Sequence, residues 1–590
     1  MSQAREIEKG SAKTAPCQSG PLFIPEKMAL ERWIAIGVFA VSLLYLLLFR
    51  RMTSMEPDEG IILQGTERIL RGEVLYRDFF SYFTPGSYYL LALLFKVFGD
   101  SLLVARTALA VYGGLFSAFT YLMARRVCSL WAALAATYLV TITCLPWRFL
   151  VLHNWDSTLW ACAAVYCATR FIEASGNAGL QPGIFTPTTD KTKCRPKERR
   201  YKIFQMHVGW AFAAGSFASL TFLFEQSKGA GLMLGLALAF MLVWIFARSS
   251  LRVGRPQLLA LATGLAWPVA LTFAYFASQH AMRELLTDWF WPLHNYSIAN
   301  KVPYGHWDLS DETSELLFHS GPWLGRGLVL FSLSPSFLQP VLPIVAVILL
   351  AYWTLQARNG GLAPDRAAYY IATCTSLAGL LFSVVVVRPN IIHFVYLGPL
   401  TYLVLAWIMD GADIRGRLVN SIRPIVTIAV LIAFTAVGMA FLVANRGAHW
   451  TMETRRGRIT ADGPDAVLPY VLAHVPAGSK MLVYPYLPLY NYLTATYSPT
   501  RYEYLQPGMH TRQQEEEAID EIEADRTDVV LIEPGFSEKI ANAWPNTPLE
   551  SVANDPVGDY ILAHYHSCRI LRSAPGWPFV YMVRKDLACP

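Results

Sequence analysis

The stretch GSYYLLALLFKVF, residues 86–98, decides how the chain passes through a membrane. It is apolar, but its 13 residues form a helix of only about 20 Å at the α-helical rise per residue. The apolar core of a bilayer is about 30 Å thick. The stretch also carries Lys96. We therefore predict a helix that lies in the membrane interface, with the next true span at residues 101–124.

With this assignment, eleven apolar segments are expected to cross the bilayer. They are residues 33–49, 101–124, 128–145, 156–172, 207–224, 228–247, 257–279, 333–356, 367–387, 393–409 and 424–444. The short basic clusters, beginning with Arg125 and Arg126, then all fall on the side of the N-terminus. Because basic loops stay on the cytoplasmic face, the outer face receives loops 50–100 and 280–325 and everything after residue 445. A span at 86–98 would invert every later loop.

The composition also indicates a membrane protein. Of the 590 residues, 54% are hydrophobic and 16% are charged, whereas an average soluble protein has about 25% charged residues. The net charge of +6 lies in the loops between apolar segments, so it does not indicate a nucleic-acid partner. We expect an integral protein of the bacterial inner (plasma) membrane, in contact with membrane lipid, with residues 1–32 as a cytoplasmic tail.

Residues 446–590 differ in character and predict a separate extracytoplasmic domain. Apolar strands such as MLVY and VVLIE alternate with helical stretches such as EEEAIDEIEAD, a pattern typical of a small α/β layer domain. The predicted fold class is therefore mainly α, with a transmembrane helical domain at 33–445 and this α/β domain after it. Cys568 and Cys589 both lie in the domain, where they either pair or remain free thiols.

The segment MEPDEG, residues 55–60, places Glu56, Asp58 and Glu59 directly after the first span. The ordinary explanation is a set of solvated loop charges. However, the acids are tied between a span and the interfacial helix, where partial loss of water raises the pKa of a carboxylate toward that of a general base. A catalytic role is the alternative to a solvated loop.

The same region resembles a known family. An acidic pair after the first span, a Tyr-Arg-Asp stretch, Thr-Pro-Gly and a short apolar helix ending in Phe-Gly are similar to the GT-C membrane glycosyltransferases. Their members include protein mannosyltransferases, aminoarabinose transferases and Rhizobium lipopolysaccharide transferases. The resemblance covers residues 33 to about 175. It implies a GT-C fold, a polyprenyl-phosphate-linked sugar donor and inverting transfer.

The resemblance also implies roles for the acidic pair. Asp58 would accept the proton of the acceptor hydroxyl, and Glu59 would orient the acceptor or help to hold Asp58 or a metal. Many members have an aromatic residue or Ala after the pair, whereas this chain has Gly60. This departure leaves the contacts to the acceptor open.

A lipid-phosphate donor releases an anion, so its departure requires cations or hydrogen-bond donors close by. The residues predicted to bind the phosphate are Arg388, His393, Arg148 and Lys228. An arginine at such a boundary can equally snorkel to the interface without binding anything, and Lys228 can equally pair with Glu225.

Aromatic and polar side chains on the outer face suit an acceptor or a sugar ring. The residues predicted for this role are Tyr82, His153, His294 and Tyr304. The only cofactor considered is a divalent metal ion, at His294 or His306 with a carboxylate, against the ordinary case of a structural histidine.

Two other functions compete with a glycosyltransferase. A transporter or flippase of a lipid-linked or envelope precursor would have ionisable groups or broken helices near the bilayer midplane, whereas the polar groups here gather at the outer boundary. The other is a non-catalytic scaffold. The leading hypothesis is transfer of a sugar to a glycan, lipid or protein acceptor. The lack of a Gly-rich nucleotide fingerprint agrees with a lipid-linked donor.

Overall fold

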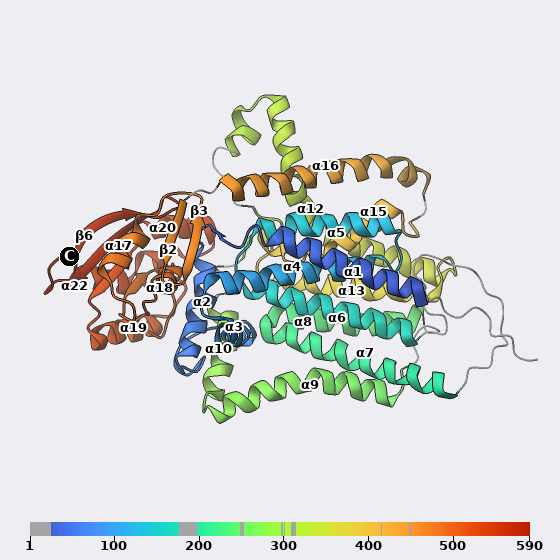
Figure 1. The fold of residues 1–590 in the computed structure, drawn as a ribbon, viewed down its shortest axis with the longest axis horizontal. Coiled ribbons are helices and arrows are strands. Elements are labelled where there is room, and N and C mark those ends of the chain that lie inside the picture. The colour runs from blue at the N-terminus through green and yellow to red at the C-terminus, as the bar shows by residue number, and fades with distance from the viewer. Residues whose placement is uncertain are drawn as a thin grey trace, which may run out of the picture.

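The computed structural model describes residues 25–175, 197–247, 253–296, 299, 301–307, 314–414, 416–447 and 450–590. A bundle of long helices makes up one part, and a C-terminal α/β domain is attached to one end of it (Figure 1). We call this the domain end of the bundle and the opposite end the far end. Residues 1–24 of the predicted tail and the basic loop around Lys191 lie outside the described residues.

The long helices run side by side along the bundle (Figure 1). They are α1 (Pro25–Leu46), α4 (Leu102–Ala124), α5 (Leu130–Trp147), α6 (His153–Ser175), α7 (Lys197–Phe224), α8 (Gln226–Phe246), α9 (Arg255–Ser278), α12 (Trp323–Arg358), α13 (Pro364–Val387) and α16 (Arg417–Gly447). Within the described residues, eight helices are long and apolar enough to cross a membrane: α4, α5, α7, α8, α9, α12, α13 and α16. These eight coincide with eight of the eleven predicted spans.

The other three predicted spans correspond to α1, α6 and a broken helix. A single helix over residues 393–409 was a wrong prediction: the structure has α14 (Ile391–Val395) and then α15 (Gly398–Asp410). Pro399 lies in the first turn of α15, where the missing N–H of proline is tolerated and a new helix can begin. With 13 residues, α15 is about 20 Å long and too short for a span by itself.

The predicted interfacial helix is α3 (Gly86–Phe98), with the expected boundaries. It ends because Gly99 has a φ of 95°, a conformation that glycine adopts without steric cost. Together with α2 (Pro57–Leu70) and α10 (Met282–Asn295), α3 lies at the domain end, beside the C-terminal domain (Figure 1).

The C-terminal domain is built on a four-stranded sheet, which confirms the predicted α/β class. The strand order is β4 (Leu482–Tyr484), β5 (Val529–Ile532), β7 (Pro578–Arg584) and β6 (Tyr565–Arg572). β4 and β5 are parallel, and the remaining pairs are antiparallel. Its helices are α17 (Val467–His474), α18 (Leu489–Thr494), α19 (Arg512–Asp525), α20 (Phe536–Ala543), α21 (Leu549–Ala553) and α22 (Pro556–His564).

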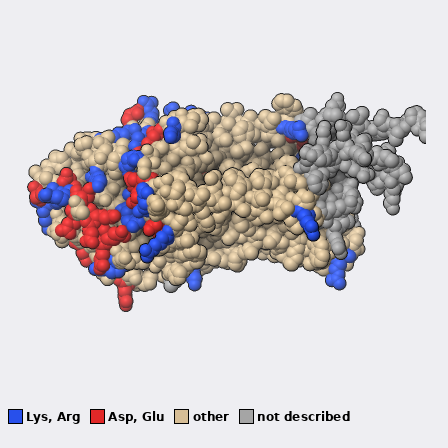
Figure 2. All heavy atoms as spheres, turned by 90° about the horizontal axis from the view of Figure 1, so that it is seen from below, with Lys and Arg blue, Asp and Glu red and all other residues tan. Residues whose placement is uncertain are grey.

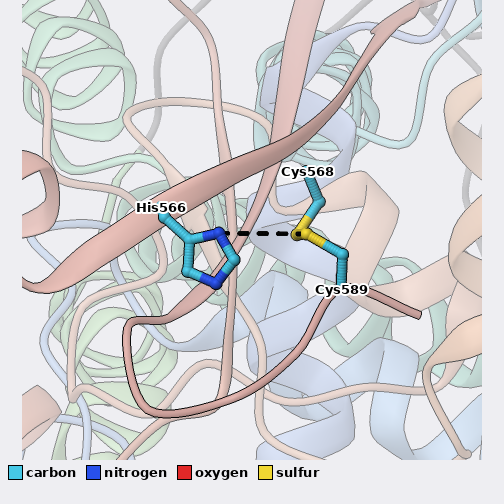
Figure 3. Close-up of side chains that lie close together, drawn as sticks. All are labelled: His566, Cys568 and Cys589. Carbon is cyan, nitrogen blue, oxygen red and sulfur yellow. Dashed lines mark hydrogen bonds between the residues drawn. A yellow bond between two sulfur atoms is a disulfide. The ribbon is translucent and has the colours of Figure 1, made fainter.

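A disulfide joins Cys568 on β6 to Cys589 near the end of the chain (Figure 3), which settles the alternative left open by the sequence. His566 lies beside it, with its Nδ1 atom 3.8 Å from the Cys589 sulfur. Among the described residues, these three form the only group with metal-binding geometry. Since both sulfurs are used in the disulfide, this arrangement offers a metal only one good ligand atom.

The C-terminal domain is fastened to the loop between the first two long helices. The short strand β1 (Met52–Thr53) pairs in parallel with β3 (Gly457–Ala461), which pairs with β2 (Trp450–Thr454). Arg68 of α2 bonds to Glu503 at 3.1 Å, and Arg456 reaches Asp100 at 3.1 Å. The domain therefore docks directly on the loop that carries the predicted catalytic acids.

The distribution of charge separates the two parts of the molecule. On the face shown in Figure 2, acidic and basic side chains gather on the C-terminal domain and at its junction with the bundle. The bundle itself presents a broad uncharged belt, and Lys and Arg side chains return at the far end. An uncharged belt between two charged ends is the surface expected of a helical bundle that crosses a membrane.

Candidate active site at the domain end

The acids enter the site through the first turn of α2. Glu56 is the N-cap, Pro57 is the first helical residue, and Asp58 and Glu59 follow. Carboxylates are favoured here by the positive end of the helix dipole. Consecutive helical residues point about 100° apart, so the side chains of Asp58 and Glu59 point in different directions. Asp58 contacts the C-terminal domain, whereas Glu59 contacts the bundle.

Glu59 is a buried anchor. Its two oxygens accept hydrogen bonds from Nε and Nη2 of Arg106 on α4, at 2.9 and 2.5 Å, and one of them also accepts from the Val151 amide at 3.0 Å. Both charged side chains are 0% exposed. Arg106 and the Val151 amide occupy the carboxylate, so of the roles predicted for Glu59 this arrangement favours help in holding Asp58 in place, and that role stays a prediction.

Asp58, by contrast, is accessible, with 41% of its side chain exposed. Arg148 donates from Nη2 to one carboxylate oxygen at 3.0 Å, and the Tyr486 hydroxyl donates to the other at 2.6 Å. Arg148 also lies 3.4 Å from Glu56. Burial raises the pKa of Glu56 above its ordinary value; Asp58 and Glu59 add to the rise, and Arg148 opposes it. The site thus holds one accessible carboxylate against an arginine and a phenol.

Lys228, predicted to bind phosphate, lies in the interior with 2% of its side chain exposed. Its ammonium group pairs with Glu225 at 2.9 Å and also donates to Ser157 at 2.8 Å and to the Asn154 carbonyl at 2.9 Å. Burial alone would raise the pKa of Glu225, but Lys228 and His153 lower it to about 2. The hydrogen-bond donors of the Lys228 ammonium group are therefore used within the protein. In this arrangement Lys228 stabilises the segments around the site and offers no donor to a ligand.

Arg388 and His393 flank the site from the side of α13 and α14. Arg388 donates to the Ala543 carbonyl of the C-terminal domain, and its guanidinium lies 5.6 Å from the centre of the Trp544 ring. His393 bonds through Nδ1 to Asn390 at 2.5 Å. The positive groups of Arg388, Lys228 and Arg148 all act electrostatically on His393. The predicted phosphate-binding residues therefore come from separate segments, and Arg148 and Arg388 are connected through Asp58, Tyr486 and Trp544.

Tyr396, not predicted from the sequence, lies next to two of these residues, Lys228 and His393. Its ring is 5.7 Å from the Lys228 ammonium, 6.0 Å from the His393 ring and 4.9 Å from the Trp155 ring. It is 3% exposed. Tyr396 lies between the end of α14 and the start of α15. Because the helix is interrupted there, the Tyr396 ring occupies a place through which the backbone of a continuous helix would run.

Of the residues predicted to contact the acceptor, two lie near Asp58. Tyr82 stacks on Trp291, with 5.4 Å between ring centres, and accepts a hydrogen bond from Tyr504 at 3.1 Å. His153 packs on Phe83 at 4.1 Å and is linked electrostatically to Asp58. Tyr82 is thus connected to Asp58 through Tyr504 and Tyr486, whose ring centres lie 4.9 Å apart.

The structure does not bring the other two into this group. Tyr304 donates to the Pro340 carbonyl at 2.6 Å and packs on Phe394, while His294 is an exposed residue in the last turn of α10. Within the part of the chain that is described, neither His294 nor His306 belongs to a cluster that could hold a metal.

Tyr486 and Trp544 are site residues that the sequence did not reveal. Both come from the C-terminal domain, more than 400 residues after Asp58 in the chain. The stretch PYLPLYNYL around Tyr486 follows the apolar strand MLVY, and nothing in its spacing singles out one of its tyrosines. Only the docking of the domain on α2 creates the contact.

Gly60 has a structural role in that docking, which gives a first prediction. A Cβ atom at this position would collide with the backbone of Leu489 and lie 2.9 Å from the Pro488 carbonyl carbon. We expect Gly60→Ala to destabilise the docked arrangement by about 1–3 kcal/mol, the usual cost of overpacking. Thermal unfolding of the purified protein measures it. Gly37→Ala, which meets nothing within 4 Å, is the control, and equal melting temperatures for the two variants would contradict the prediction.

His153 gives a prediction about pH. Burial lowers its pKa from 6.5 to about 4, against the pull of Glu225. Because the folded-state pKa is the lower one, the unfolded chain binds the proton first as the pH falls. The neutral form of His153 therefore makes its full contribution to the free energy of unfolding above about pH 6.5. This contribution is lost progressively as the pH falls toward about 4.

The measurement is the melting temperature at neutral and mildly acidic pH. His153→Phe keeps a ring against Phe83 but removes the titrating group, so we expect its melting temperature to fall less on acidification than that of the wild type. His474→Phe, at an exposed position on α17, serves as the control. An unchanged pH dependence in His153→Phe would show that this group does not carry the effect.

Fold and site together define a polytopic helical membrane protein whose acidic site is closed on one side by an α/β domain. Residues 83–181 match the family model of dolichyl-phosphate-mannose-protein mannosyltransferase. This similarity confirms the predicted GT-C resemblance over the part of the chain that the two share. A search of curated proteins finds no match.

Several solved structures are similar in fold. ArnT from Cupriavidus metallidurans bound to undecaprenyl phosphate is 12% identical, with a TM-score of 0.48 over 96% of this chain and 100% of that one. The Archaeoglobus fulgidus oligosaccharyltransferase tethered to an acceptor peptide is 13% identical, with a TM-score of 0.46 over 95% of this chain and 75% of that one.

Proposed function

We propose that the protein is a membrane glycosyltransferase that moves a sugar from a polyprenyl-phosphate-linked donor to an acceptor hydroxyl. The observation that carries the proposal is the setting of Asp58. It is an accessible carboxylate, 41% exposed, at the domain end of the bundle and hydrogen-bonded to the guanidinium of Arg148. The match of residues 83–181 to a family named for a lipid-phosphate sugar donor supports the same class of reaction.

In the proposed reaction Asp58 is the general base. It accepts the proton of the acceptor hydroxyl while the oxygen attacks the anomeric carbon and the bond from that carbon to the phosphate oxygen breaks. The bonding electrons leave with the lipid phosphate. Attack from the face opposite the leaving group inverts the anomeric centre. General-base catalysis requires a positioned carboxylate within hydrogen-bond reach of the hydroxyl, and Asp58 offers one.

The leaving phosphate would be stabilised by Arg148, Arg388 and His393. An arginine can present two parallel donors to phosphate oxygens, which a lysine cannot. In the structure Arg148 lies on Asp58 and Arg388 lies on Trp544. The centre of the Trp544 ring in turn lies 6.0 Å from that of the Tyr486 ring. Asp58 and Arg388 are therefore connected through two side chains, the phenol of Tyr486 and the indole of Trp544.

We further propose that this site faces the extracytoplasmic side. α4 begins beside the Glu59–Arg106 pair and ends 23 residues later at Arg125 and Arg126, which is about 35 Å along a helix axis. These arginines are therefore at the far end, where basic residues mark the cytoplasmic face. The site and the C-terminal domain then lie outside, where lipid-linked sugars are the available donors.

The test is a panel of radiolabelled polyprenyl-phosphate sugars offered to membranes that contain the protein and to matched membranes that lack it. We expect protein-dependent incorporation of label from one donor into a glycan, lipid or protein product. A parallel series with a chelator tests a requirement for a divalent metal. Absence of transfer from every donor, together with protein-dependent movement of the lipid across the bilayer, would favour a flippase.

A further inference from the structure

Both oxygens of the Asp58 carboxylate are engaged in the structure. Arg148 donates to one at 3.0 Å and the Tyr486 hydroxyl donates to the other at 2.6 Å. A general base needs one oxygen for the proton that it removes. Arg148 supplies the charge that holds Asp58 in place, whereas the phenol of Tyr486 is a neutral partner, so the bond to Tyr486 is the one that an acceptor hydroxyl can replace.

The Tyr486 phenol remains a donor in this setting. Burial raises its pKa well above the ordinary value, and the negative charge of Asp58 raises it further. It therefore stays protonated at neutral pH and does not compete with Asp58 as a base. What it does is fill the position next to the carboxylate oxygen that a hydroxyl group would otherwise occupy.

The backbone next to Tyr486 is fixed, but its side chain is half-buried. Two residues further on, Pro488 and Leu489 press directly on Gly60 of α2, so the loop cannot move away as a unit without undocking. The ring itself is bordered by Tyr504 at 4.9 Å and by Phe536 and Trp544 at 6.0 Å. Rotation of one side chain is therefore the motion that frees Asp58.

Trp544 adds a second polar group beside Tyr486, with 6.0 Å between the two ring centres. Its indole N–H is buried and has no hydrogen-bond partner among the described residues. Buried donors are usually satisfied, and a ligand hydroxyl that entered between Tyr486 and Trp544 could accept this bond.

We propose that Tyr486 is a place-holder on the catalytic base: its phenol occupies the hydrogen-bonding position on Oδ1 of Asp58 that water would otherwise take, until an acceptor hydroxyl replaces the phenol. The exchange swaps one hydroxyl-to-carboxylate hydrogen bond for another of the same kind, so it needs no large driving force. This inference rests on the proposed glycosyl transfer and assigns the C-terminal domain a part in it: the domain suppresses wasteful hydrolysis of the donor. Tyr486 acts through Asp58 and is a positioning residue.

The side reaction is defined chemically. If water takes the place of the phenol, Asp58 accepts a proton from water while its oxygen attacks the anomeric carbon. The bond from that carbon to the phosphate oxygen breaks, and the lipid phosphate leaves with the electron pair. The products are free sugar and lipid phosphate, and no further reactant is required.

The experiment measures release of free sugar from radiolabelled polyprenyl-phosphate mannose, or from whichever sugar of the donor panel is transferred, using the full-length protein. We expect Tyr486→Phe to raise the ratio of hydrolysis to transfer about tenfold, the equivalent of one lost hydrogen bond. The matched control is Tyr490→Phe in the same domain, which removes a phenol bonded at 2.8 Å to Asp465. It should leave the ratio unchanged.

Three outcomes would overturn the inference. One is an equal fall of hydrolysis and transfer in Tyr486→Phe, which is the signature of a purely structural residue. Another is enhanced hydrolysis that survives in the double variant Asp58→Asn/Tyr486→Phe. The third needs no variant: wild-type protein without acceptor would hydrolyse the donor as fast as it transfers sugar when acceptor is present. A wild-type protein that neither transfers nor hydrolyses contradicts the proposed function itself.

Discussion

Asp58→Asn is expected to lower the rate of sugar transfer by about 100- to 10,000-fold, the range that a positioned general base contributes. The substitution keeps the shape of the side chain, but its single amide oxygen can accept only one of the two hydrogen bonds that Arg148 and Tyr486 donate to separate oxygens of Asp58. It also removes the negative charge that pairs with Arg148 and the ability to accept the acceptor proton. Initial rates of label transfer from the active donor of the panel, at saturating donor, measure the effect.

The control is Asp520→Asn, the same change at an exposed position on α19, which should transfer sugar at the wild-type rate. Glu56→Gln tests whether the effect belongs to Asp58 alone. Glu56 shares Arg148 at 3.4 Å but does not bond to Tyr486, so we expect a much smaller loss. Equal transfer by wild type and Asp58→Asn would remove Asp58 as the base and leave the acidic loop without a catalytic role.

The sequence predicts those parts of the fold that depend on local pattern. Helix α3 has the expected boundaries because Gly86 and Gly99 bracket one uninterrupted apolar stretch. Strands β4, β5 and β7 follow from short apolar runs. The break between α14 and α15 was missed since Pro399 was read as a residue inside a span and not as the start of a second helix.

The site was predicted less completely, for a physical reason. Asp58 and Arg148 can be singled out because each is a charge next to an apolar segment. The sequence cannot show that Glu59 faces the bundle, because this follows from packing of α2 against α4. Nor can it show that Lys228 is saturated by Glu225 and Ser157. Tyr486 lies still further from any sequence signal, since its contact with Asp58 arises only where two parts of the chain that are distant in sequence meet.

The Glu59–Arg106 pair should give the largest effect on stability. Arg106→Ala leaves the Glu59 carboxylate in the interior without its guanidinium, and breaking one partner of a buried ion pair costs about 3–5 kcal/mol. Because Glu59 also fixes the first turn of α2 through the Val151 amide at 3.0 Å, the loss should displace Asp58 as well. Thermal unfolding in detergent and the yield of folded protein measure the change.

A double variant separates the charge from the packing. Glu59→Gln/Arg106→Met removes both charges while keeping side chains of similar length, so the uncompensated carboxylate is gone and most of the lost stability should return. Arg125→Ala is the matched single control, since Arg125 pairs with Glu31 at 3.1 Å but both side chains are partly exposed, at 17% and 18%. A pair that keeps contact with water contributes less than a fully buried one. If Arg106→Ala were no more destabilising than Arg125→Ala, the buried pair would not be the anchor that holds the catalytic turn against the bundle.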